Sequence, residues 1–195
     1  MPQDLKVYFN FRSPYCFLAA QTMFDLFERF NVTLQWRPLG GWDGRSPPER
    51  AAVKIPSVRQ DVARWARRLG VSYAPPPPTT DPTLAALASF VAEEKGLLRP
   101  YVIEVMKAEW SEGQDIGNAE VLIQAAARAG LDEADVRTAF DNADYQARLA
   151  RHAEEAKGEK VFGVPSFVVS EEIFWGNDRL DFLGEHLTEL GLAKS

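Results

Sequence analysis

The spacing of apolar residues predicts two strands joined by a helix at the start of the chain. Residues 5–11 form a short apolar run rich in β-forming side chains, and residues 32–38 alternate apolar and polar side chains. Between these runs, apolar residues recur at near-helical spacing from Pro14 to Phe30, which predicts a single helix. That helix is long enough to connect two parallel strands, so the predicted order is β-α-β.

The middle of the chain follows a helical period and carries no strand signal. After a loop rich in glycine and proline, helices are predicted at about residues 56–69, 82–94, 99–110, 118–129 and 132–140. A polar helix at about 143–157 precedes two short strands within 161–175, and a final helix begins at Asn177.

This order predicts the fold class, which is α/β with thioredoxin-like β-α-β and α-β-β-α halves and an all-helical domain inserted between them. We expect residues 1–40 and 143–195 to form the thioredoxin-like domain, and residues 41–142 to form the inserted helical domain. A chain of 195 residues is long enough to bury the core of one small domain together with an insertion.

Charge and composition narrow the function classes. The formal net charge of −6 disfavours a nucleic-acid partner, because affinity for the phosphate backbone depends on lysine and arginine. The absence of a basic leader and of an apolar run of about 18 residues disfavours secretion and a membrane partner. One cysteine cannot form an internal disulfide, and two separated histidines offer no metal cluster. We therefore expect a cytoplasmic protein without a metal.

The stretch "FRSPYC" has a serine where redox proteins often carry the first cysteine of Cys-x-x-Cys, at the junction of the first strand and helix. Ser13 suits a helix N-cap and Pro14 suits the first turn, so simple capping is one interpretation of Ser13. Tyr15 and Cys16 are candidates for a substrate pocket. Packing is the alternative for both, and an isolated cysteine in an apolar run is more often a small buried hydrophobe.

Several segments in the same order resemble one family over nearly the whole chain. "FNFRSPYCFLAA", "FGVPSFVV" and "FWGNDRLDFL" are similar to the 2-hydroxychromene-2-carboxylate isomerases and the kappa-class glutathione transferases. The middle segments "SPPERAAVKIPSVRQDVARWARRLG" and "EWSEGQDIGNAEVLIQAAARAGLD" resemble the corresponding helices. The resemblance implies a thioredoxin-like fold with a helical insertion, glutathione as cofactor, a small aromatic or electrophilic substrate, and a homodimer.

The resemblance also implies roles for residues at three places. Ser13 is the residue placed against the sulfur of glutathione, where it supports the thiolate. Pro165 is expected to be a cis-proline, with an ordinary trans-proline at the start of a strand as the alternative, and the cis form leaves the backbone of Val164 to pair with an extended peptide such as glutathione. Asn177 and Asp178 are expected to hold the γ-glutamyl end at the start of the last helix, where simple capping is the alternative.

Three cationic residues are further candidates. Many relatives carry an asparagine that contacts glutathione in the loop after the second strand, and Arg45 stands at the matching place in a shorter loop here. Arg45 either meets a carboxylate of a ligand or is a solvated loop arginine. Lys54 and Arg179 are candidates for contacts with glutathione or substrate carboxylates, and a solvated helix face is the alternative for both.

Three functions remain open from the sequence. The first is a glutathione-dependent isomerase that converts 2-hydroxychromene-2-carboxylate to trans-o-hydroxybenzylidenepyruvate, or acts on a similar product in the degradation of aromatic compounds. The second is a kappa-class-like glutathione transferase or peroxidase, which would consume glutathione. The third is a thioredoxin-fold binding module without turnover. A dithiol oxidoreductase is disfavoured, because it would need a second cysteine.

Overall fold

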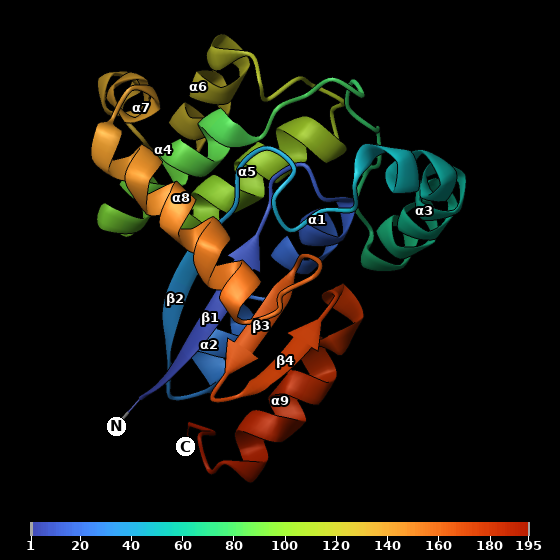
Figure 1. The fold of residues 1–195 in the computed structure, drawn as a ribbon, viewed down its shortest axis with the longest axis vertical. Helices are drawn as coiled ribbons and strands as arrows, with labels where there is room; N and C mark the ends of the chain where they lie inside the picture. Colours follow the sequence, from blue (N-terminus) through green and yellow to red (C-terminus); the bar gives the residue numbers. More distant parts are fainter. Residues whose placement is uncertain (1, 195) are drawn as a thin grey trace.

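Two parallel strands form one side of the sheet, and a hairpin from the end of the chain completes it. The computed structural model describes residues 2–194, in which β1 (Gln3–Phe9) pairs in parallel with β2 (Val32–Pro38). On its other edge β1 pairs antiparallel with β3 (Ser166–Val169), which in turn pairs antiparallel with β4 (Glu172–Trp175). The order β2-β1-β3-β4 therefore brings the two ends of the chain into one sheet (Figure 1).

Helices occupy the middle of the chain, as the helical period predicts. The hairpin follows them, and α9 (Leu180–Glu189) then packs against β4. Asparagine or aspartate caps three of the helices, because side-chain oxygens of Asn118, Asp132 and Asn142 accept hydrogen bonds from first-turn N–H groups. The helices of the middle are α3 (Pro48–Leu69), α4 (Thr83–Glu94), α5 (Leu98–Trp110), α6 (Ala119–Arg128), α7 (Glu133–Phe140) and α8 (Ala143–Gly158).

The sheet and the helical segment share one hydrophobic core. Phe9, Phe11 and Trp36 lie against one another at the ends of the parallel strands, and the ring of Phe11 also lies 5.8 Å from the ring of Tyr101 on α5. The indole N–H of Trp36 donates to Ser89 on α4 at 2.9 Å. These contacts fix the helical segment on the sheet, because each aromatic side chain loses its packing if the two parts separate.

The prediction of a single helix from Pro14 to Phe30 is wrong, because this part of the chain forms two helices. They are α1 (Pro14–Ala20) and α2 (Asp25–Arg29), separated by a turn. In a continuous helix the N–H of Gln21 would bond to the carbonyl four residues earlier. Instead, the side-chain amide of Gln21 donates to that carbonyl at 3.0 Å, and its backbone N–H bonds to the next carbonyl along at 3.3 Å.

Two predicted helix starts also differ from the structure. The first helix of the middle segment begins at Pro48 and not at residue 56, because Pro48 fills the first turn, where a missing N–H costs no hydrogen bond. Pro56 lies inside α3. The last α-helix begins at Leu180, and Asn177 and Asp178 lie in a single 3₁₀ turn before it. No helix within residues 2–194 has the length and apolar character needed to cross a membrane.

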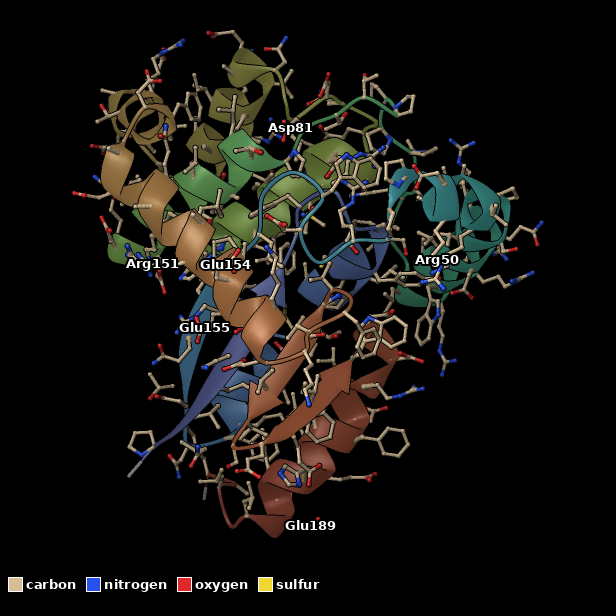
Figure 2. The ribbon with its side chains drawn as sticks, in the orientation of Figure 1. Arg50, Asp81, Arg151, Glu154, Glu155 and Glu189 are labelled. Carbon is tan, nitrogen blue, oxygen red and sulfur yellow. The ribbon has the colours of Figure 1, made fainter. Side chains whose placement is uncertain are left out.

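Ion pairs tie α8 to the sheet just before the chain re-enters it. Glu155, labelled on α8 in Figure 2, pairs with Lys6 of β1 and Arg37 of β2, each at 2.7 Å. Glu159 also pairs with Lys6 and accepts a hydrogen bond from the hydroxyl of Tyr8 at 2.8 Å. Because β3 follows α8 after a short loop, these contacts help to place that loop beside the start of α1.

Candidate active site

Ser13 meets the peptide between Val164 and Pro165 at the start of α1, although 151 positions separate Ser13 from Val164. Ser13 caps α1, because its Oγ accepts a hydrogen bond from the N–H of Cys16 at 3.3 Å. The same hydroxyl donates to the carbonyl of Val164 at 3.3 Å. The peptide bond between Val164 and Pro165 is cis, which confirms the prediction made for it.

A second backbone contact brings the 3₁₀ turn to the same place. The N–H of Gly176 donates to the carbonyl of Pro165 at 2.9 Å. Gly176 has a φ of +112°, and a Cβ at this position would lie 2.5 Å from Oδ1 of Asp178, so the turn requires glycine. Asp178 pairs with Arg179 at 2.6 Å, and 47% of each side chain is exposed.

These segments and α3 enclose a hollow of about 240 Å³, which we call the corner cavity. Its walls come from α1, α3, the cis-proline segment, the end of β4 and the 3₁₀ turn. Five residues singled out from the sequence come together in it, and Ser13 contacts its wall through Val164. The lining residues are Tyr15, Asp61, Trp65, Val164, Trp175, Gly176, Asn177, Asp178 and Arg179.

Three side chains of the corner cavity were not expected from the sequence. Asp61 and Trp65 lie one helical turn apart on α3 and so share a helix face. This spacing is the one feature of the local sequence that could have indicated that they act together. Trp175, at the end of β4, is 49% exposed. The hydroxyl of Tyr15 donates to Asp61 at 3.1 Å and joins α1 to α3 across the cavity.

The phenol of Tyr15 is a hydrogen-bond donor at neutral pH. Burial, followed by the negative charge of Asp61, raises the pKa of Tyr15 to about 12. The charge of Asp178 acts in the same direction, which places both carboxylates near this hydroxyl. The corner cavity therefore combines two carboxylates, a protonated phenol and the guanidinium of Arg179.

Cys16 lies in the core and does not line the corner cavity. Its side chain is completely buried, and burial raises the pKa of the thiol to about 12. A thiol with this pKa is protonated at neutral pH and is a poor nucleophile. The geometry therefore favours the packing interpretation of Cys16 over a place in the substrate pocket.

Arg45 and Lys54 also lie outside the walls of the corner cavity. Nη1 of Arg45 donates to the carbonyl of Gly41 at 3.2 Å, and the guanidinium carbon lies 4.1 Å from the ring centre of Trp42. Lys54 is exposed on α3, where its Nζ donates to Oγ of Ser46 at 3.1 Å. The structure thus leaves these two candidates outside the cavity that Val164, Asn177 and Asp178 line.

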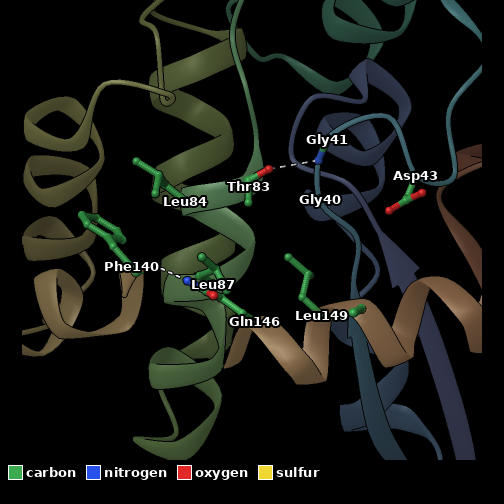
Figure 3. Close-up of a pocket in the computed structure, with 10 residues that line it drawn as sticks. Gly40, Gly41, Asp43, Thr83, Leu84, Leu87, Phe140, Gln146 and Leu149 are labelled. Atoms are coloured by element: carbon green, nitrogen blue, oxygen red, sulfur yellow. Dashed lines mark hydrogen bonds between the residues drawn. The ribbon is translucent and has the colours of Figure 1, made fainter. Parts of the chain in front are cut away.

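A larger hollow of about 460 Å³ lies between the helices and the loop after β2 (Figure 3). Leu84, Leu87, Phe140 and Leu149 give it mainly apolar walls. None of the residues singled out from the sequence lines it. The polar groups that could position a peptide ligand therefore gather at the corner cavity, although it is the smaller of the two.

The fold and this junction define a class of protein. Residues 4–188 match the DSBA-like thioredoxin domain family, so the chain belongs to that family. It is 31% identical to the 2-hydroxychromene-2-carboxylate isomerase of Sphingobium xenophagum, over 97% of this chain and 100% of that protein. It is 27% identical to the protein of the same name from Pseudomonas putida, over 90% of each chain.

A solved structure described as 2-hydroxychromene-2-carboxylate isomerase has the same fold, with a TM-score of 0.80 at 24% identity over 96% of each chain. The sequence resemblance to these isomerases and the thioredoxin-like fold class are thus confirmed. The resemblance to kappa-class glutathione transferases, the homodimer and the cytoplasmic location stay predictions.

Proposed function

We propose that this protein is a glutathione-dependent isomerase that converts 2-hydroxychromene-2-carboxylate to trans-o-hydroxybenzylidenepyruvate or acts on a similar product of aromatic ring fission. The observation that carries the proposal is the meeting of the Ser13 hydroxyl, the Val164 backbone and the turn at Asn177 around one cavity. The names of the two curated relatives support the reaction class.

The groups around the corner cavity suit a peptide with a charged amino-acid end. The backbone N–H of Val164 has no acceptor within residues 2–194, so it is available to an extended peptide. The carboxylates of Asp61 and Asp178 suit an ammonium group, and the guanidinium of Arg179 suits a carboxylate. Together they match the zwitterionic γ-glutamyl end of glutathione.

Ser13 is well placed to hold a thiolate. Its hydrogen bond to the carbonyl of Val164 is long for a hydroxyl donor, so the proton can turn to a stronger acceptor at small cost. Lowering the pKa of a thiol by roughly two units requires about 2.7 kcal/mol, and a hydrogen bond to a charged group contributes about 1.5–3 kcal/mol. Because α1 has only seven residues, we expect its dipole to add at the low end of about 0.3–1 kcal/mol.

Bound glutathione would supply a nucleophilic thiolate for reversible addition to a conjugated substrate. The chain's own residues bind and orient the reactants. Ser13 holds a hydroxyl proton toward the sulfur, and the corner cavity positions the peptide. Cys16 takes no part, because its buried thiol keeps its proton.

Turnover of 2-hydroxychromene-2-carboxylate with a small amount of glutathione tests this proposal. We expect product to exceed glutathione many times over while total glutathione stays constant. Loss of one glutathione per turnover would instead indicate a transferase or peroxidase, and absence of glutathione binding in calorimetry would favour a binding module. Ser57→Ala, at an exposed position on α3, is the matched control for Ser13→Ala.

A further inference from the structure

The loop that carries Arg45 covers the side chain of Val164. A Cβ at Gly44 would lie 2.6 Å from Leu39 Cδ1 and 2.8 Å from Val164 Cγ1, and Gly44 has a φ of +66°. This position therefore requires glycine. The carbonyl of the same Val164 accepts the hydrogen bond of Ser13. Arg45, the next residue in the loop, is in this way held close to the Ser13 junction.

Buried hydrogen bonds fix the loop in place. Asn10 is completely buried, and its side-chain amide donates to the carbonyls of Gly41 at 3.3 Å and Asp43 at 3.1 Å. The N–H of Gly41 donates to the hydroxyl of Thr83 on α4 at 3.2 Å (Figure 3). Because Asn10, directly after β1, and Thr83 on α4 both hold the loop, the position of Arg45 does not depend on a flexible segment.

Arg45 is a half-buried cation without a partner of opposite charge. No carboxylate within residues 2–194 lies at ion-pair distance from it, and the carbonyl of Gly41 is the one hydrogen-bond acceptor of its guanidinium there. Its Nε and Nη2 are not sealed from solvent. Stacking on Trp42 holds the guanidinium plane, which leaves the edge with these donors open to a ligand.

A second arginine adds to the positive charge on this side of Ser13. Arg12 lies over the ring of Trp110 at 5.2 Å, its Nη2 donates to the carbonyl of Pro77 at 3.0 Å, and its Nη1 lies 3.7 Å from Oε1 of the completely buried Glu109. Burial, followed by the charge of Arg12, lowers the pKa of Arg45 to about 10, so Arg45 stays charged at neutral pH. We call Arg12, Arg45 and Glu109 the basic cluster.

We propose that Arg45, reinforced by the charge of Arg12, binds the carboxylate of an aromatic acid substrate beside Ser13, which rests on the proposed function. A guanidinium edge matches a carboxylate, and the surplus positive charge favours an anion. Arg45 does not line the corner cavity, where the groups that suit glutathione gather. Substrate and cofactor would thus meet Ser13 from regions of opposite charge.

Salicylate binding tests Arg45 without needing glutathione. By calorimetry we expect Arg45→Gln to weaken salicylate binding about tenfold or more, and Arg45→Lys, which keeps the charge, to lose less. Arg50→Gln, at an exposed position on α3 (Figure 2), should bind salicylate like wild type. Salicylamide, which lacks the charge, should bind equally to wild type and Arg45→Gln. Circular dichroism checks that each variant folds.

The outcomes separate this inference from the proposed function. Equal salicylate affinity in wild type and Arg45→Gln, or no salicylate binding by wild type, would overturn the carboxylate site. The carboxylate site would also be overturned if Arg45→Gln lost as much affinity for glutathione as for salicylate, because the arginine would then hold the cofactor. If glutathione does not bind but salicylate binding depends on Arg45, the carboxylate site stands and the glutathione-dependent isomerase is lost.

Discussion

Ser13 lies between two regions that differ in charge and in access to water. One region is the corner cavity, where the carboxylates of Asp61 and Asp178 outnumber the one guanidinium of Arg179. The other region is the basic cluster, in which two arginines act on the single carboxyl of Glu109. The side chain of Asp178 is 47% exposed, whereas the side chain of Glu109 is completely buried.

This difference teaches that equal changes of charge should have unequal effects in the two regions. Water screens the exposed ion pair of Asp178, so its contribution is small. Glu109 has no such screening, and neither of its oxygens has a hydrogen-bond donor within residues 2–194. The contrast also suits a division of labour, because an acidic cavity attracts an ammonium group and a basic cluster attracts a carboxylate.

The largest expected effect is on stability, in Arg12→Leu. Removal of Arg12 leaves the buried Glu109 without its nearest cation, so the free energy of unfolding at pH 8 should fall by about 3–5 kcal/mol. Burial raises the pKa of Glu109, so the folded state retains a proton that the unfolded chain releases. The charge of Arg12 opposes this rise in the wild type, so the stability of the variant should fall more steeply than that of the wild type as pH rises above about 4.5. Urea unfolding at pH 5 and pH 8 measures both effects.

A double variant supplies the control for this prediction. Arg12→Leu with Glu109→Leu replaces both charged groups by apolar ones, so it should recover most of the lost stability and show little of the pH dependence. If Arg12→Leu alone is as stable as wild type at both pH values, then Arg12 does not stabilise the buried carboxyl of Glu109. The two regions would then not differ in how strongly a charge affects stability.

Much of the fold and part of the site follow from local sequence patterns. The structure confirms three features that depend on neighbours in the chain. They are the cap at Ser13, the order of helices and strands along the chain, and the hairpin near Ser170. Asp61 meets Tyr15 only because α3 packs beside α1, and this long-range contact leaves no local pattern. The early start of α3 and the break after α1 are local features, set at Pro48 and Gln21, that the period of apolar residues alone does not show.

The buried position of Glu109 had a signal in the sequence. It follows Val102 and Val105 on α5 at spacings of seven and four residues, and all three are completely buried. Helical spacing therefore places a carboxylate on an apolar helix face. What the sequence could not give is its partner, because Arg12 lies far away in the chain and reaches Glu109 only in the folded protein.

The next largest effect is expected on turnover, in Ser13→Ala. Loss of the hydroxyl should reduce turnover about 25-fold at pH 7, because a thiol whose pKa returns from about 6.5 to about 8.5 is ionised to about 3% instead of about 76%. Loss of the cap should lower the free energy of unfolding by only about 0.5–2 kcal/mol. Assays at rising pH sharpen the test, because the defect should shrink as the thiol ionises unaided. Unchanged activity at pH 7 would mean that Ser13 does not support the thiolate, and the two regions would then not meet at a reactive group.

A smaller effect is expected in Cys16→Ala. Removing the buried sulfur should lower the free energy of unfolding by about 1–2 kcal/mol and leave turnover within about twofold of wild type. In the wild type, the raised pKa and burial of the thiol should make alkylation by iodoacetamide at pH 7 very slow until urea unfolds the chain. Rapid alkylation of the folded protein, or loss of turnover with the fold intact, would place Cys16 in the reaction.

The smallest effect is expected in Asp178→Ala, measured as glutathione affinity. Because the side chain is half exposed and already paired with Arg179, the loss should be up to about fivefold, which corresponds to about 1 kcal/mol. The loss should shrink further in 1 M salt, where exposed charges are screened. Asp181→Ala, at an exposed position on α9 outside the corner cavity, is the matched control. A loss above a hundredfold that salt does not reduce would mean that the ligand buries Asp178, and the contrast in screening between the two regions would then disappear on binding.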